Sequence, residues 1–129
     1  MIEIVNLSKS YRKGEVKAVD NLNLKVKAGE IFGFLGPNGA GKTTTIKMMV
    51  GLLKPDRGSI TINGFDISRQ PLEVKKSISY VPESPEIYEK LTGIEYLNFM
   101  ADVYSVPGAV RREKIPALLD LFSLSGVVG

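Results

Sequence analysis

The feature that most constrains the fold is a glycine-rich loop at residues 36–44, Gly-Pro-Asn-Gly-Ala-Gly-Lys-Thr-Thr. It fits the pattern G-x-x-x-x-G-K-[ST]. Gly36, Gly39 and Gly41 lack a Cβ, so the backbone can adopt positive φ and approach a ligand closely. The loop N–H groups are then expected to point inward as a nest for an anion. A helix is expected to begin where the loop ends, with its positive pole towards the same anion.

The side chains at the end of the loop suit nucleotide phosphates. Lys42 carries a flexible point charge that matches β- and γ-phosphates. Thr43 offers a hydroxyl to Mg²⁺, which holds phosphates through few protein ligands. Pro37, Asn38 and Ala40 complete the loop between the glycines. Together these residues form a Walker A motif, which predicts a site for Mg-nucleotide.

The sequence on either side of the loop supports this interpretation, because the motif is expected between a strand and a helix. Residues 30–35 are typical of a short buried strand. After the loop, apolar side chains at helical spacing predict one amphipathic helix that runs to about Leu53, with a face formed by Ile46, Met49, Val50 and Leu53. The alternative is a glycine-rich turn that opens an amphipathic helix and binds nothing.

Composition limits the class of protein. The 129 residues are enough for one domain with a core, and the net charge of +3 is too small to indicate nucleic-acid binding. The chain contains neither cysteine nor histidine, which excludes disulfides, thiol chemistry and histidine ligands, and suits a cytosolic protein. No apolar run reaches the length of a membrane span, and the N-terminus does not resemble a signal peptide.

Periodicity predicts the remaining elements of the first two thirds of the chain. Alternating patterns favour strands, and clusters of Gly, Pro, Asn and Asp favour the turns between them. Pro71 suits the first turn of a short helix. The predicted strands are 2–11, 16–27, 30–35, 59–62, 65–67 and 78–81, and the predicted helix is 71–77.

The last third is predicted to be helical. Residues 83–90 are polar and are expected to form a loop. Thr92 and Glu95 then have the spacing of a capping box, which predicts a helix from Thr92 that stops before Pro107. A final helix is expected within 110–123, with a kink or a restart at Pro116. The predicted division is 1–82, a linker at 83–90, and 91–129.

Three stretches resemble the ATP-binding cassette (ABC) ATPases. Residues 18–30 are similar to the strand that leads into the phosphate loop of that family, and 36–44 have its form of the Walker A motif. Residues 51–64 are similar to the segment that follows in the family. The resemblance covers nearly the whole chain. It implies an incomplete α/β P-loop NTPase fold: part of a parallel sheet flanked by helices, an N-terminal antiparallel β-subdomain, and the start of a helical subdomain.

The resemblance also implies roles for individual residues. Tyr11 matches the aromatic residue that stacks on adenine, although a tyrosine at a strand end can equally serve packing. Thr44 would donate a further hydrogen bond to phosphate. Glu83 falls where the family most often has the glutamine of its Q-loop, and its carboxylate can still ligate Mg²⁺. This departure hints at a subgroup that serves export-type transporters. A solvated loop glutamate is the alternative.

Other motifs of the family are not present, namely its signature sequence, its Walker B strand and its switch histidine. We therefore expect the chain to be the N-terminal part of a longer cassette that is inactive alone, and we assign no catalytic residue within it. The parent would be the ATPase subunit of a transporter, binding ATP and Mg²⁺. It would pair with a second cassette and with transmembrane subunits, as a peripheral protein on the cytoplasmic face of the cell membrane.

Three alternatives stay open at this point. A soluble, non-transport ABC ATPase would share every motif described above. A P-loop GTPase or small-molecule kinase shares only the loop, and this chain lacks the Asn-Lys-x-Asp motif that GTPases use to recognise their base. The third is a nucleotide-binding fragment without turnover. The transported substrate and the direction of transport belong to the membrane partner and cannot be deduced from this sequence.

Overall fold

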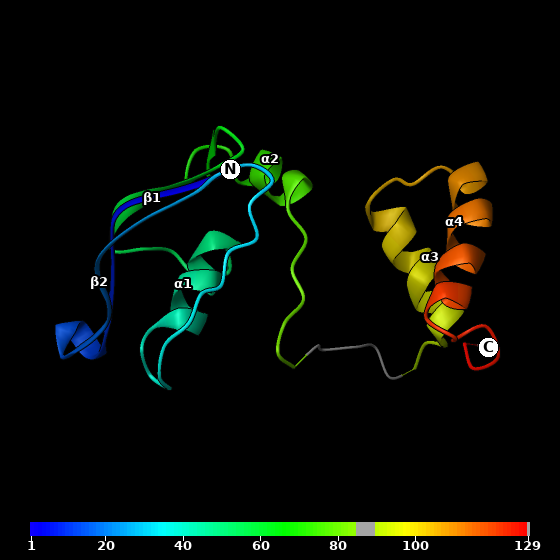
Figure 1. The fold of residues 1–129 in the computed structure, drawn as a ribbon, viewed down its shortest axis with the longest axis horizontal. Coiled ribbons are helices and arrows are strands. Elements are labelled where there is room, and N and C mark those ends of the chain that lie inside the picture. The colour runs from blue at the N-terminus through cyan, green and yellow to red at the C-terminus, as the bar shows by residue number, and fades with distance from the viewer. Residues whose placement is uncertain (85–89, 129) are drawn as a thin grey trace. The chain divides into compact units, whose positions relative to one another are not determined.

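The computed structural model describes residues 1–84 and 90–128. These residues divide into two compact units, Met1–Val81 and Pro82–Gly129. The first unit holds a four-stranded sheet and two α-helices, and the second holds two further α-helices (Figure 1). The glycine-rich loop and Tyr11 belong to the first unit, and Glu83 belongs to the second.

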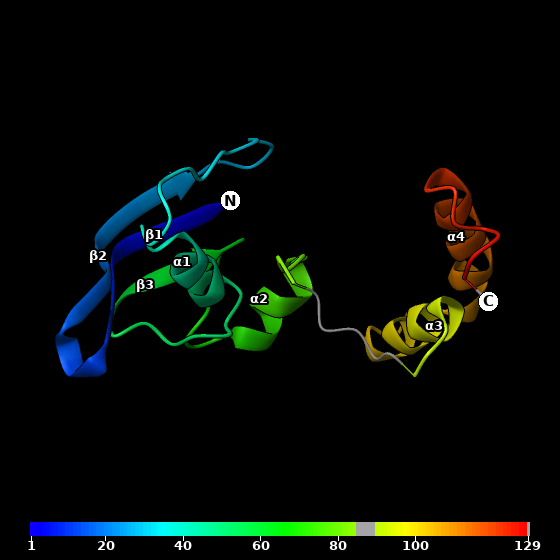
Figure 2. The same ribbon diagram turned by 90° about the horizontal axis from the view of Figure 1, so that it is seen from below.

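The sheet of the first unit is antiparallel throughout and has the strand order β2-β1-β3-β4. Figure 2 shows β2, β1 and β3 in this order. Alternation of apolar and polar side chains explains these strands, because one face of the sheet packs on the core. The antiparallel β-subdomain predicted near the N-terminus is therefore present. The strands are β1 (Ile2–Tyr11), β2 (Val16–Val26), β3 (Arg57–Ile62) and β4 (Phe65–Asp66).

β1 is the central strand, and its two ladders differ in length. Its ladder with β2 runs from the pair Ile2–Val26 to the pair Tyr11–Val16, with shifts in register after Ile4, Leu7 and Lys9. Its ladder with β3 ends earlier, at the pair Ser8–Arg57. A short 3-10 helix, Arg12–Gly14, joins β1 to β2. The last residues of β1 are thus paired by backbone on one side only.

Two helices begin where the sequence predicts them. α2 (Pro71–Ser77) begins with proline in its first turn, as expected. α1 (Lys42–Met49) begins at the end of the glycine-rich loop but stops before the predicted Leu53. The helix ends early because Gly51 adopts φ +74° just beyond it. Glycine in the left-handed conformation at this place is the usual way for an α-helix to terminate.

The core lies between the sheet and the helices α1 and α2. Met48 of α1 and Val74 of α2 are completely buried, together with apolar side chains of the sheet. The predicted face of α1 is therefore displaced: Thr45 and Met48 are its buried residues, whereas Ile46 and Met49 are half-buried. The core consists of Ile4, Leu7, Val19, Met48, Ile60, Ile62, Ile67 and Val74.

Two predicted strands do not form. Residues 30–35 and 78–81 have no ladder partner within the described ranges 1–84 and 90–128, so the parallel sheet predicted from them is absent from this part of the chain. Residues 30–35 run as an extended segment between β2 and α1 (Figure 1), and Ile31 and Leu35 are almost entirely exposed. A short apolar run becomes a strand only when a neighbour accepts and donates its backbone hydrogen bonds.

The second unit contains α3 (Gly93–Val103) and α4 (Gly108–Leu121). The predicted capping box is confirmed: Thr92 Oγ1 accepts from Glu95 N at 3.4 Å, and Glu95 Oε2 accepts from Thr92 N at 2.9 Å. Arg111 of α4 pairs with Asp102 of α3 at 2.6 Å.

The sequence predicted a kink or a restart at Pro116. α4 continues through this residue, so there is no restart, and the kink stays a prediction. A proline removes one backbone N–H donor, and a kink is one way for a helix to accommodate it without ending. Of the predicted linker at 83–90, residues 85–89 lie outside the described residues. Among the helices that the structure describes, none has the length and apolar character needed to cross a membrane.

Candidate phosphate-binding site

The glycine-rich loop connects the extended segment 30–35 to α1 through a tight turn. Ala40 N donates to Pro37 O at 3.2 Å. Gly39 and Gly41 adopt φ +83° and +85°, values that favour glycine. Gly36 does not adopt positive φ, which corrects that part of the prediction. A Cβ at Gly36 would lie 3.3 Å from the Cβ of Ala40, so this glycine provides space for the turn.

The first turn of α1 leaves its backbone donors available. Gly41 caps the helix, and no side chain bonds to the free N–H groups of the first turn. The first internal bonds reach Gly41 O, from Thr45 N at 2.8 Å and from Thr45 Oγ1 at 2.9 Å. Within the described residues, no partner is found for the N–H groups of Lys42, Thr43 and Thr44. The positive pole of α1 therefore faces an open loop and is suited to an anion.

Lys42 folds back over the loop from the start of α1. Its Nζ donates to Gly36 O at 2.5 Å and to Pro37 O at 2.8 Å. Lys42 is half-buried as a residue, and its ammonium has no acidic partner among the residues that the structure describes. The Lys42 ammonium can exchange these two neutral carbonyls for phosphate oxygens, because its hydrogen bonds to an anion are stronger than its hydrogen bonds to a neutral carbonyl.

The two threonines after Lys42 differ in exposure. Thr43 is exposed and Thr44 is half-buried. Neither side chain has a hydrogen-bond partner within residues 1–84 and 90–128. Residues 36–40 are all exposed, and a cavity of about 250 Å³ adjoins Lys42 and Ala40. The loop, both hydroxyls and the ammonium are therefore accessible to a ligand.

The end of the loop is pressed against β2. A Cβ at Gly41 would lie 2.1 Å from Ala18 O, closer than any real contact. Tyr11 ends the neighbouring strand β1 and is paired with Val16, two residues before Ala18 on β2. Its side chain is 41% exposed. One hairpin thus holds both the loop and the predicted base-stacking residue.

The predicted metal ligands Thr43 and Glu83 are both exposed. They belong to different compact units, and each is described within its own unit. In the described part of the chain, no three carboxylates cluster in a way that could hold a metal ion. Both residues stay predictions as ligands of Mg²⁺.

One residue important to the loop was not predicted from the sequence. Thr45 is 2% exposed, and its hydroxyl bonds to the same Gly41 carbonyl that accepts the first helical bond. This second bond fixes the cap of α1. Its signal in the sequence is a threonine four residues after the last loop glycine, a spacing at which a helical hydroxyl can reach a backbone carbonyl.

The chain is similar to known proteins over most of its length. The sequence pattern of the family described as "ABC transporter" matches residues 19–126. Among curated proteins, an uncharacterised ABC transporter ATP-binding protein of Nostoc is 41% identical over 93% of this chain and 37% of its own length. The lipopolysaccharide export system ATP-binding protein of Haemophilus influenzae is 41% identical over 95% of this chain and 51% of its own length.

Two solved structures extend the similarity to the fold. One is described as the ATP-binding subunit of an ABC transporter; it is 35% identical, has a TM-score of 0.88, and is matched over 99% of this chain and 52% of its own. The other is a dimeric ATP-binding cassette bound to ADP and phosphate, 27% identical, with a TM-score of 0.77 over 93% of this chain and 56% of its own. The chain spans about half or less of the length of the relatives it matches.

Proposed function

The chain belongs to the ABC transporter family of ATP-binding proteins, and we propose that its loop 36–44 is a Walker A site that binds Mg-ATP. The observation that supports this proposal is the open start of α1. Three backbone N–H groups that have no partner in the described part of the chain lie with the Lys42 ammonium at the start of α1. Such an arrangement favours a polyanion, because backbone donors, helix pole and side-chain charge all act on the same position.

Each residue would have a distinct task when nucleotide binds. Lys42 leaves the carbonyls of Gly36 and Pro37 and neutralises the β- and γ-phosphates. The amides of the loop and of Thr44 hold the phosphate oxygens. Tyr11, exposed at the end of β1, offers a π face on which a base can stack. Such stacking adds affinity without selecting adenine strongly, because every base has a π face.

The residues present fit Mg²⁺. The Thr43 hydroxyl is exposed and has no partner in the described ranges, and a hydroxyl and a carboxylate are ligands that this ion prefers. Thr43 and, by its place in the sequence, Glu83 would hold the ion. The bound ion supplies positive charge that neutralises the phosphates. We assign no catalytic residue, and the contribution of this chain to phosphoryl transfer is to position the nucleotide.

We further propose that the chain acts within the ATPase subunit of a transporter, at the cytoplasmic face of the cell membrane. It would work there with a second cassette and with transmembrane subunits. Support comes from the similar proteins, whose names include a probable multidrug ABC transporter ATP-binding protein of Escherichia coli and a peptide export ATP-binding protein of Bacillus subtilis. These names also favour the export-type subgroup suggested by Glu83. A neighbour of known structure is dimeric.

Replacement of the loop lysine tests this proposal. Lys42→Ala should weaken binding of a fluorescent ATP analogue by about ten- to a hundredfold, since a hydrogen bond to a charged group contributes about 1.5–3 kcal/mol. Lys47→Ala is the matched control, because Lys47 is an exposed lysine of the same helix. The control should bind as the parent chain does. Equal dissociation constants for the parent and Lys42→Ala would refute the assignment of the loop.

A further inference from the structure

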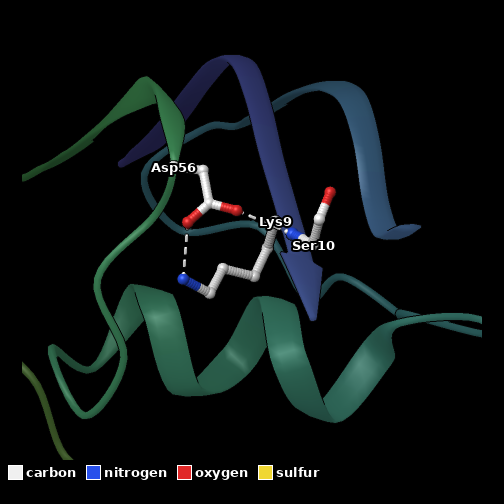
Figure 3. Close-up of polar contacts among 3 residues, drawn as sticks. All are labelled: Lys9, Ser10 and Asp56. Atoms are coloured by element: carbon white, nitrogen blue, oxygen red, sulfur yellow. Dashed lines mark hydrogen bonds and ion pairs between the residues drawn. The ribbon is translucent and has the colours of Figure 1, made fainter. Parts of the chain in front are cut away.

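The end of β1 is held by a side chain from a distant loop. Asp56 precedes β3 and lies beside Lys9 and Ser10 of β1 (Figure 3). Its Oδ1 accepts from Lys9 Nζ at 2.6 Å, and its Oδ2 accepts from Ser10 N at 2.7 Å. Its own N–H donates to Ser8 O at 3.0 Å. Three bonds therefore join one residue to three successive residues of β1.

We call the three bonds from Asp56 to Ser8, Lys9 and Ser10 the Asp56 clamp. This clamp begins where the backbone ladder between β1 and β3 stops. The last pair between β1 and β3 is Ser8–Arg57, so Ser10 has no partner from the backbone of β3. In an antiparallel ladder, residues i and i+2 turn their backbone groups to the same neighbour. Ser8 O and Ser10 N both bond to Asp56, and its carboxylate therefore continues the ladder for Ser10.

The opposite side of the same segment is irregular. The ladder with β2 shifts register on both sides of Lys9 before it reaches the final pair, Tyr11–Val16. Beyond Tyr11 the chain turns at once into the 3-10 helix Arg12–Gly14. At the very end of β1, Ser10 and Tyr11 are paired with Lys17 and Val16 of β2. The Ser10–Asp56 bond adds a second support on the other side of Ser10, next to Tyr11.

Charge and burial keep the clamp in place. The Lys9 side chain is 15% exposed and that of Asp56 is 45% exposed. The hydrogen bond from Lys9, and next the bond from Ser10, hold the pKa of Asp56 below its ordinary value. The carboxylate is therefore ionised at neutral pH, and both of its oxygens act as acceptors.

We infer that Asp56 is a positioning residue for nucleotide binding: it fixes the end of β1 through Ser10 and so orients Tyr11 for stacking on the base. This inference rests on the proposed function, in which Tyr11 contacts the base and the loop 36–44 contacts the phosphates. Asp56 itself touches neither ligand group. Its loss should therefore weaken binding of a nucleotide that has a base and spare binding of a phosphate chain that lacks one.

The test compares Mg-ATP with magnesium tripolyphosphate on the 129-residue chain. Both displace the same fluorescent ATP analogue. Asp56→Ala should weaken the binding of ATP by about fivefold or more, which corresponds to the lower end of the free energy that one stacked base contributes. The same variant should leave the binding of tripolyphosphate unchanged. The matched control is Glu3→Ala, which removes the exposed Glu3–Lys25 pair at the other end of β1. This control should change the affinity for neither ligand.

A double-mutant cycle with Tyr11 separates positioning from general stability. Tyr11→Ala should weaken the binding of ATP but not that of tripolyphosphate. When Asp56→Ala is added to the Tyr11→Ala variant, it should weaken the binding of ATP no further. Asp56→Asn keeps one carbonyl oxygen and should lose ATP affinity by a smaller factor, again without effect on tripolyphosphate. This milder variant decides the matter if Asp56→Ala binds neither ligand.

Several results would overturn the inference. An equal loss of both ligands in Asp56→Asn would mean that Asp56 only stabilises the unit, and no loss in either Asp56 variant would mean that it has no part in binding. An undiminished effect in the Tyr11→Ala background would show that Asp56 acts by another route. The proposed function fails separately: in that case Lys42→Ala would leave tripolyphosphate binding unchanged.

Discussion

Two glycines of the phosphate loop adopt nearly the same φ for different reasons. At Gly39, a Cβ would meet nothing within 4 Å, so only the left-handed backbone favours glycine there. At Gly41, a Cβ would also overlap Ala18 O at 2.1 Å. The first residue makes the turn possible, whereas the second allows the loop to lie against β2. The contact of Gly41 places the start of α1 beside the hairpin that holds Tyr11.

This difference predicts unequal costs for two matched substitutions. Gly39→Ala should lower the free energy of unfolding by about 1–2 kcal/mol, the usual cost of an L-residue in the left-handed region. Gly41→Ala should lower the free energy of unfolding by more than this. The added methyl group would also collide with the backbone of Ala18, which cannot move without disturbing β2. Urea unfolding followed by circular dichroism measures both. Equal midpoints for the two variants would contradict the importance of the Ala18 contact.

At the scale of elements, α1 and α3 begin in opposite ways. α3 is closed by its own side chains, since Thr92 and Glu95 exchange hydrogen bonds across the first turn. α1 has glycine at its cap and no acidic residue in its first turn. A helix that satisfies its own first turn has little left for an anion. This contrast supports α1, and not α3, as the helix that would receive phosphate.

The capping box of α3 can be tested alone. Thr92→Ala should cost about 1 kcal/mol of helix stability, which corresponds to roughly fivefold faster amide exchange in the first turn of α3. Thr92→Ser keeps the hydroxyl and serves as the control, with exchange close to that of the parent chain. Hydrogen exchange followed by NMR reports on Glu95 N directly. Unchanged protection in Thr92→Ala would show that the box does not stabilise the helix.

At the scale of the whole molecule, one apolar segment lacks the environment that its sequence suits. Ile31, Phe32 and Leu35 are exposed, although residues 30–35 have the composition of a buried strand. Phe32 and Phe34 line an apolar cavity of about 320 Å³ together with Ile46 and Met49 of α1. An exposed apolar surface of this kind is typical of a face that another protein segment covers.

ATP hydrolysis also depends on the whole chain, because it requires groups from several elements. We expect the 129 residues alone to release no phosphate from ATP above background. The loop supplies binding, and binding that is equal in ground and transition states does not speed the chemical step. Attack on the γ-phosphate needs an oriented water. The chain has no histidine and no apolar strand that ends in adjacent Asp and Glu.

A malachite-green assay of the chain beside Lys42→Ala checks this expectation. Both proteins should give the same signal as buffer with ATP. Steady phosphate release that disappears in the variant would mean that a catalytic group lies within these residues. Proteins of this family hydrolyse ATP, and a similar cassette is known in a state after hydrolysis. The prediction therefore concerns this chain alone and not the family.

Much of the molecule was predictable from sequence because its causes are local. Alternation over a few residues specified β1 and β2, proline and glycine specified the start of α2 and the turns, and the pair Thr92–Glu95 specified the start of α3. The loop 36–44 was recognisable for the same reason, since its glycines, lysine and threonines lie next to one another. Backbone preferences and short-range hydrogen bonds are encoded within such windows.

Only the tertiary structure decided the features that depend on distant partners. Residues 30–35 have the composition of a strand, yet a strand exists only where another segment pairs with it, and no described segment does so. Asp56 lies between the helix predicted to run to about Leu53 and the predicted strand 59–62, and nothing in its sequence neighbourhood indicates that it would bond to Ser10, 46 residues away. Such contacts arise from how segments pack, which no single stretch of the sequence contains.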